Sequence, residues 1–99
     1  MHSVMINRED WSGEQEKVQI YKDGSFKIMG YTFRLVRKPE QEDDYFAFVA
    51  EIHGEGWTDK LGSVIRCNDE KGYTALDSNM NRDDLDPTVA AAKLLCNLI

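Results

Sequence analysis

The sequence predicts an α+β fold in which an antiparallel β-meander of four to five strands precedes one C-terminal α-helix packed on one face of the sheet. Two patterns carry this prediction. Residues 86–99 are rich in alanine and leucine and begin with an aspartate–proline pair, which is typical of a helix start. Earlier apolar residues instead alternate with polar ones between turn-forming residues, as in strands joined by hairpins. We therefore expect one domain over residues 1–99.

The predicted helix, residues 86–99, begins with strong chemical signals. The carboxylate of Asp86 accepts hydrogen bonds from first-turn N–H groups, and Pro87 fits the first helical position because that position needs no donor. One set of residues recurs at helical spacing and is expected to face the sheet: Leu85, Val89, Ala92, Cys96 and Ile99. Another set widens the apolar surface beyond the usual stripe: Ala90, Ala91, Leu94, Leu95 and Leu98. Either a dimer or partner surface covers this excess, or the N-terminal residues wrap it.

The predicted meander occupies residues 16–78, after a poorly patterned segment at residues 1–15. Its best local signal is Asp23-Gly24, a favoured two-residue hairpin turn between two alternating runs. Residues 45–50 are apolar on both faces, which indicates a central strand covered on both sides. The expected core is a set of inward-facing residues: Val18, Ile20, Phe33, Leu35, Phe46, Phe48, Val64, Leu76, Val89, Ala92 and Cys96.

The charge balance and the cysteine content exclude several classes of protein. The net charge is −6, from 18 acidic and 12 basic residues, and this balance opposes direct nucleic-acid binding. Neither a membrane-spanning apolar stretch nor a signal sequence is apparent, so the prediction is a cytoplasmic protein without membrane contact. Cys67 and Cys96 are too few and too far apart for a disulfide framework, and we expect two thiols that fill core space. A bridge between them stays open, because a helix packed on a sheet can bring them close.

Catalytic motifs are missing from the sequence, which predicts a protein that is not an enzyme and needs no cofactor. The candidate acid or base is His53, which Glu51 or Glu55 would orient, and a Cys67–His53 nucleophile pair needs proximity that no spacing demonstrates. One alternating run of oxygen side chains resembles the opening of a calcium loop: Asp77, Asn79, Asn81 and Asp83. It lacks the usual glycine, the bidentate glutamate and an entering helix, so ordinary turn formation is the stronger interpretation.

Binding residues are easier to nominate. Trp57 lies between Gly56 and Thr58 in a predicted loop, where it is either an interface anchor or a lid folded on the sheet. The other candidates are aromatic, acidic or neighbours of Trp57: His53, Glu55, Tyr31, Tyr45, Tyr73, Asp43 and Asp44.

Three functions follow from these residues. The first is a small acidic interaction module, a regulator or inhibitor that binds a protein partner or a second copy of itself. The second is an acidic decoy that occupies a nucleic-acid-binding protein, as a mobile-element antagonist or a toxin-neutralising protein does. The third is a small ligand-binding domain or enzyme centred on His53, Cys67 and Trp57.

Overall fold

The computed structural model describes residues 2–8, 13–38, 45–52, 54–67 and 72–97. The elements in chain order are β1 (His2–Asn7), β2 (Gln15–Ile20), β3 (Ser25–Ile28), β4 (Tyr31–Arg37), β5 (Phe46–Ala50), β6 (Gly62–Arg66), β7 (Tyr73–Leu76), β8 (Asn81–Asp84) and α1 (Pro87–Cys96). All eight strands form one antiparallel sheet in which each strand pairs with its sequence neighbours. The fold is therefore α+β with an antiparallel meander.

The predicted number of strands was wrong: the meander has eight strands, not four to five. Two of the additional strands give little signal in the sequence. In β1 the only buried residue is Ile6, and β8 contains no apolar residue at all. Both are strands because their backbones pair with β2 and β7, from His2↔Ile20 in one case and Leu76↔Asn81 in the other. A hydrophobic period cannot reveal a strand that is held mainly by backbone hydrogen bonds.

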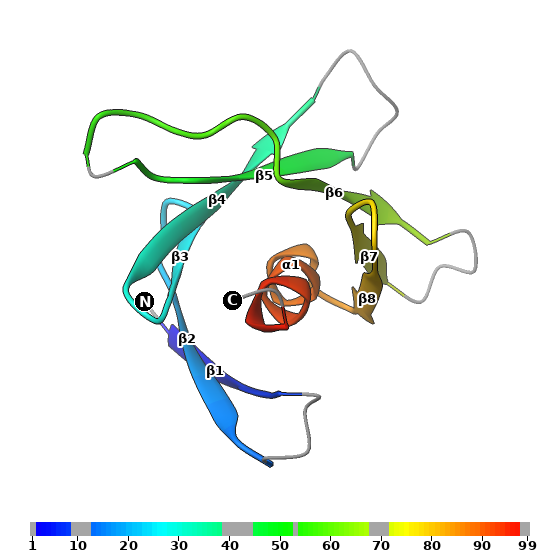
Figure 1. The fold of residues 1–99 in the computed structure, drawn as a ribbon. Coiled ribbons are helices and arrows are strands. Elements are labelled where there is room, and N and C mark those ends of the chain that lie inside the picture. The colour runs from blue at the N-terminus through cyan, green and yellow to red at the C-terminus, as the bar shows by residue number, and fades with distance from the viewer. Residues whose placement is uncertain (1, 9–12, 39–44, 53, 68–71, 98–99) are drawn as a thin grey trace.

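The sheet curls around α1 into a half-barrel, so the helix lies inside the curl and not on one face of a flat sheet (Figure 1). It packs against β7, β8, β6, β1 and β3. This arrangement explains the wide apolar surface of the helix, because almost every turn meets a strand. The buried residues of α1 are Ala90, Ala91, Ala92, Leu94, Leu95 and Cys96. The prediction that Leu85 faces the sheet was wrong, since Leu85 precedes the helix and is 78% exposed.

Most of the predicted core is confirmed. Val18, Ile20, Phe33, Phe48, Val64, Ala92 and Cys96 are buried, and Leu35, Phe46 and Val89 are half-buried against them. The prediction that Leu76 faces inward was wrong, because Ala75 pairs with the buried Val64 and is the core residue of β7, whereas Leu76 pairs with Ser63 on the other face and is half-buried there. Ala47 and Val49, on the outer side of β5, are buried like Phe48 on its inner side, which confirms a central strand covered on both faces. The structure adds further core residues, of which Phe26, Ile28 and Leu94 are the largest.

The Asp23-Gly24 turn is present with one more residue than predicted. Tyr21 N donates to Ser25 O at 2.9 Å, so the loop comprises residues 22–24. Gly24 has a φ of 90°, which residues other than glycine rarely adopt. A glycine in this conformation is usual at the last position of a three-residue hairpin loop. Within the described residues, no helix has the length and apolar character needed to cross a membrane.

Candidate functional site

Trp57 is positioned on the outer face of the sheet by a tight turn after β5. Glu51 pairs with Trp57 in an antiparallel bridge, and Ile52 N donates to Gly56 O at 2.8 Å. Gly54 and Gly56 both have positive φ, which lets the backbone reverse within so few residues. Residues opposite each other in an antiparallel pair point to the same face, so Trp57 lies on the side of Glu51, away from α1.

The outer face carries a hollow of about 270 Å³ beside Trp57, lined by Asp23, Ser25, Thr32, Arg34, Glu51 and Trp57. The guanidinium carbon of Arg34 lies 5.3 Å from the centre of the indole ring, a cation–π distance. Trp57 nevertheless remains 40% exposed. It thus lies on the outer face in contact with Arg34 and keeps part of its surface accessible to solvent.

A second hollow, of about 290 Å³, adjoins the first and shares Thr32 and Glu51 with it. It is lined by Lys27, Gly30, Tyr31, Thr32, Glu51 and Gly54. Tyr31 is 57% exposed there. Tyr31 borders the second hollow and Trp57 the first, but the sheet register pairs Tyr31 with the buried Ile28, so Tyr31 starts from the inner side of β4 whereas Trp57 lies on the outer side. We call these two hollows the outer-face site.

The charges of the outer-face site are mixed. Lys27 and Arg34 are basic, whereas Asp23 and Glu51 are acidic. The hydroxyl and the backbone N–H of Ser25 donate to Asp23 Oδ1 at 2.6 and 2.9 Å, and these bonds lower the pKa of the Asp23 carboxyl below its ordinary value. The outer-face site thus combines side chains of both charges with the partly exposed Trp57 and Tyr31.

The other predicted binding residues lie elsewhere. Tyr45 shares a 2.8 Å hydrogen bond with Ser63, which lowers the pKa of its phenol. Tyr73 is half-buried, packs edge-on against Phe46, and lies under the guanidinium of Arg66 at 5.4 Å. Glu55 is exposed in the turn before Trp57. His53, Asp43 and Asp44 fall outside the described residues.

The two cysteines are free thiols and not a disulfide, but only Cys96 fills core space as predicted, because Cys67 is half-buried and outside the core. Cys67 follows β6 and its sulfur lies 3.0 Å from the hydroxyl oxygen of Thr74, whereas Trp57 precedes the opposite end of that strand. Cys96 is fully buried in α1, and burial together with the negative charge of Glu16 raises its pKa to about 11. The structure thus does not bring Cys67 and Trp57 into one described site, which leaves the predicted enzyme centre without geometric support.

The oxygen-rich run proposed for calcium forms the hairpin between β7 and β8. Asp77 Oδ1 accepts the backbone N–H groups of Asn79 and Met80, each at 2.8 Å, and these bonds lower the pKa of its carboxyl. Asn81 and Asp83 lie in β8, and Asp83 accepts a 2.7 Å bond from the Thr74 hydroxyl. Among the described residues, no group of three or more histidine, cysteine, aspartate or glutamate side chains is placed to hold a metal ion.

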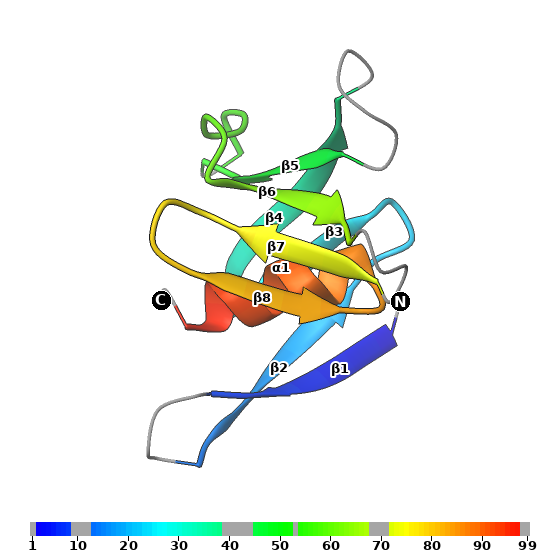
Figure 2. The same ribbon diagram turned by 90° about the vertical axis from the view of Figure 1, so that its right-hand side faces the viewer.

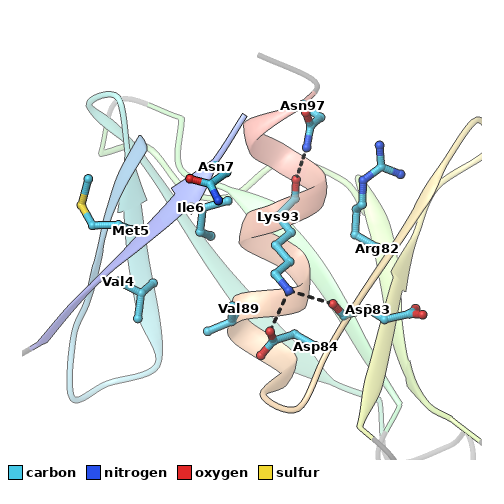
Figure 3. A pocket seen from close by; sticks show the side chains of 10 residues that line it. All are labelled: Val4, Met5, Ile6, Asn7, Arg82, Asp83, Asp84, Val89, Lys93 and Asn97. Atoms are coloured by element: carbon cyan, nitrogen blue, oxygen red, sulfur yellow. Dashed lines mark hydrogen bonds and ion pairs between the residues drawn. The ribbon is translucent and has the colours of Figure 1, made fainter. Parts of the chain in front are cut away.

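A further hollow, absent from the sequence-based analysis, lies where the half-barrel is open between β1 and β8 (Figures 2 and 3). We call it the seam. It measures about 490 Å³ and is lined by Val4, Met5, Ile6 and Asn7 of β1, Arg82, Asp83 and Asp84 of β8, and Val89, Lys93 and Asn97 of the helical segment. Lys93 Nζ lies 2.8 Å from Asp84 Oδ1 and donates to Asp83 O at 3.1 Å (Figure 3). The sequence did not predict it because β8 has no apolar residue and because in β1 the apolar Met5 between Val4 and Ile6 obscures the alternation.

Comparison with known proteins gives no relative from which to transfer a function. No protein-family model matches the chain, and neither a curated protein nor a solved structure is similar to it.

Proposed function

We propose that the protein is a non-enzymatic interaction module that binds a protein partner through the outer-face site. The observation that carries this proposal is the exposed indole of Trp57 with Arg34 held over it at 5.3 Å. Tryptophan, tyrosine and arginine dominate the residues that contribute most to protein–protein binding. Tryptophan and arginine occur here together, in Trp57 and Arg34, and Tyr31 borders the adjoining hollow.

The size and form of the site favour a protein partner over a small substrate. The two hollows hold about 270 and 290 Å³, each at or below the lower end of the range for small-molecule pockets. They adjoin on the outer face of a sheet, where the side chains of another protein reach both at once. The pairing of Arg34 with Trp57 fixes both side chains before binding, which reduces the entropy lost on association.

The acidic-decoy alternative is less well supported by the described residues. Several aspartates of the acidic surplus are engaged in local bonds: Asp23, Asp77 and Asp86 accept backbone N–H groups in turns or at the helix start. Asp84 forms an ion pair with Lys93. The positions of these carboxylates are set by the turns and the helix start that they stabilise. A decoy instead needs its negative charges gathered on one face.

The test is partner capture from a lysate of the source organism with the tagged chain and two variants. Trp57→Ala removes the anchor, and Ile65→Ala is the matched control, because Ile65 lies on β6 with a similar exposure of 38%. We expect wild type and Ile65→Ala to retain one stoichiometric partner, and Trp57→Ala to weaken binding at least about tenfold. Equal recovery by Trp57→Ala would refute the site. Loss of the wild-type complex at high salt would instead favour the decoy.

A further inference from the structure

The seam exposes backbone hydrogen-bonding groups of β1. Arg8 N donates to Glu14 O at 2.9 Å, which makes Arg8 and Glu14 a hydrogen-bonded pair next to Asn7↔Gln15. Hydrogen-bonded and non-hydrogen-bonded pairs alternate along an antiparallel ladder. The N–H and C=O groups of Ser3, Met5 and Asn7 therefore point away from β2, toward the seam. Among the described residues, no group is paired with them.

The facing edge, β8, is partly covered by the protein itself. Asp77 N donates to Met80 O, and the same alternation then directs the backbone groups of Asn81 and Asp83 toward the seam. Lys93 Nζ donates to Asp83 O at 3.1 Å and so occupies one of these groups (Figure 3). Of the two edges, β1 is the more open.

The side chains also leave β1 less protected than β8. Natural proteins protect edge strands with charged residues or proline. Three of the four residues of β8 are charged, namely Arg82, Asp83 and Asp84. By contrast, β1 reads His-Ser-Val-Met-Ile-Asn and contains no aspartate, glutamate, lysine, arginine or proline. An unprotected edge beside a hollow of about 490 Å³ is a template for an added strand.

We propose that the seam binds one extended segment of a basic partner protein, paired antiparallel to β1. Alternate side chains of this segment face inward and are apolar next to β1, where Val4, Ile6 and Val89 line the seam, whereas Arg82, Asp84 and Lys93 line its β8 side. The side chains between them face outward and are polar. The charged side chains that line the seam are balanced, with Arg82 and Lys93 against Asp83 and Asp84, so the preference for a segment flanked by basic residues rests on the net charge of −6 of the whole chain.

A second copy of the chain fits the seam less well. A second copy brings another net charge of −6. If it paired with β1 through its own β1, its β2 would lie on the far side of that strand, within the seam that β8 bounds (Figure 2). The seam also lies on different elements from the outer-face site, so each surface can be tested while the other is intact.

The first test uses two fluorescent peptides and measures binding by fluorescence anisotropy. One is Lys-Lys-Thr-Val-Thr-Val-Thr-Lys-Lys, and the other has glutamate in place of every lysine. We expect the lysine-flanked peptide to bind more tightly than the glutamate-flanked one. Met5→Pro removes one N–H that points into the seam and is expected to weaken binding about tenfold. Met5→Thr, the matched control, keeps this N–H and is expected to bind like wild type.

The second test leaves the protein unchanged, so it holds even if Met5→Pro fails to fold. N-methylation of the peptide on the alternate residues whose N–H groups face β1 is expected to abolish binding. Absence of saturable binding by either peptide, or equal binding by wild type and a folded Met5→Pro, overturns the proposal. Equal affinity for the two peptides overturns the preference for a basic partner. Sedimentation that shows a dimer lost in Met5→Pro overturns it too, because the occupant is then a second copy.

Discussion

At the residue scale, Gly62 shows how tightly the centre of the sheet is built. It begins β6, pairs with Phe48 of β5 and is buried. A Cβ atom placed on it would lie 2.6 Å from the carbonyl oxygen of Leu76 and closer still to the ring of Phe48. Glycine is required here by space alone, since its backbone conformation is one that other residues adopt.

Gly62→Ala is therefore expected to destabilise the protein by about 1–3 kcal/mol, the usual cost of overpacking. The strain arises because the Leu76 carbonyl belongs to the sheet backbone and cannot move freely. Urea denaturation of wild type and variant measures the difference. Gly24→Ala is the control: its Cβ meets nothing within 4 Å, so only the cost of positive φ remains. A Gly62→Ala variant as stable as wild type would contradict the packing of β5 against β6.

The two thiols differ in how deeply they are buried. Cys96 is fully buried, with a pKa raised to about 11, whereas Cys67 is half-buried beside Thr74. A thiol reacts as its thiolate, so burial suppresses the reactivity of Cys96 twice over. We expect a disulfide reagent at pH 8 to modify Cys67 in the folded protein and both thiols in urea. Cys67→Ala should then be inert until unfolded; rapid modification of that folded variant would show that α1 is not enclosed.

At the element scale, α1 depends on small residues for its place inside the sheet. Ala90, Ala91 and Ala92 are all fully buried, so consecutive positions around the helix meet strands on different sides. The start of the helix is fixed as the sequence predicts: Asp86 Oδ1 accepts the N–H groups of Thr88 at 2.8 Å and Val89 at 3.2 Å. The cap sets where the helix begins, and the alanines set how closely the sheet curls around it.

Enlarging this surface tests the enclosure. Ala91→Leu adds three carbon atoms at a fully buried position and is expected to cost about 1–3 kcal/mol of stability. Leu85→Ala, at a residue that is 78% exposed, is expected to change stability by less than about 0.5 kcal/mol. Thermal and urea unfolding of both variants measure these values. If Ala91→Leu were neutral and Leu85→Ala costly, the face assigned to the helix would be wrong.

At the scale of the whole molecule, the acidic chain folds into a compact domain in which an incompletely closed sheet surrounds α1. The radius of gyration is 13.0 Å, the value expected of a packed domain of this length. Asp84 is the charged side chain that ties β8 to α1. Burial acts to raise its pKa, but hydrogen bonds from Lys93 and from the backbone N–H of Asp86 outweigh burial and lower it.

Acid is therefore expected to destabilise the whole fold. Asp23, Asp77 and Asp84 have folded-state pKa values below the ordinary value of 3.8, so at low pH the unfolded chain binds more protons than the folded one. Their contribution is fully present above about pH 5 and is lost as the pH falls through the folded values. We expect Tm to drop between about pH 4 and pH 2, and to drop less steeply in Asp84→Asn. A Tm that stays constant to pH 2 would contradict these shifts.

Local chemistry in the sequence was sufficient to predict several features of this protein. The Asp86–Pro87 helix start, the turn near Gly24 and the doubly buried β5 each depend on a few neighbouring residues, and each is present. Among the candidate site residues, Trp57 could be chosen by type and loop position, and Tyr31 by type alone. Their contact with Arg34, Thr32 and Glu51 could not, because those residues come from strands paired across the sheet.

The tertiary structure alone decided how many strands there are and where the apolar surplus goes. β1 and β8 are held by ladder hydrogen bonds, which leave no period in the side chains. The wide apolar surface of the helix was open to two interpretations, a partner surface or wrapping by the N-terminal residues, and the curl of the sheet, which includes β1, covers it within the chain. That curl also brings the two edge strands, β1 and β8, to opposite sides of the seam without pairing them. The pattern of side chains along a segment indicates which residues are buried. The number of strands and the curl of the sheet depend instead on all the strand pairings together, which no single segment indicates.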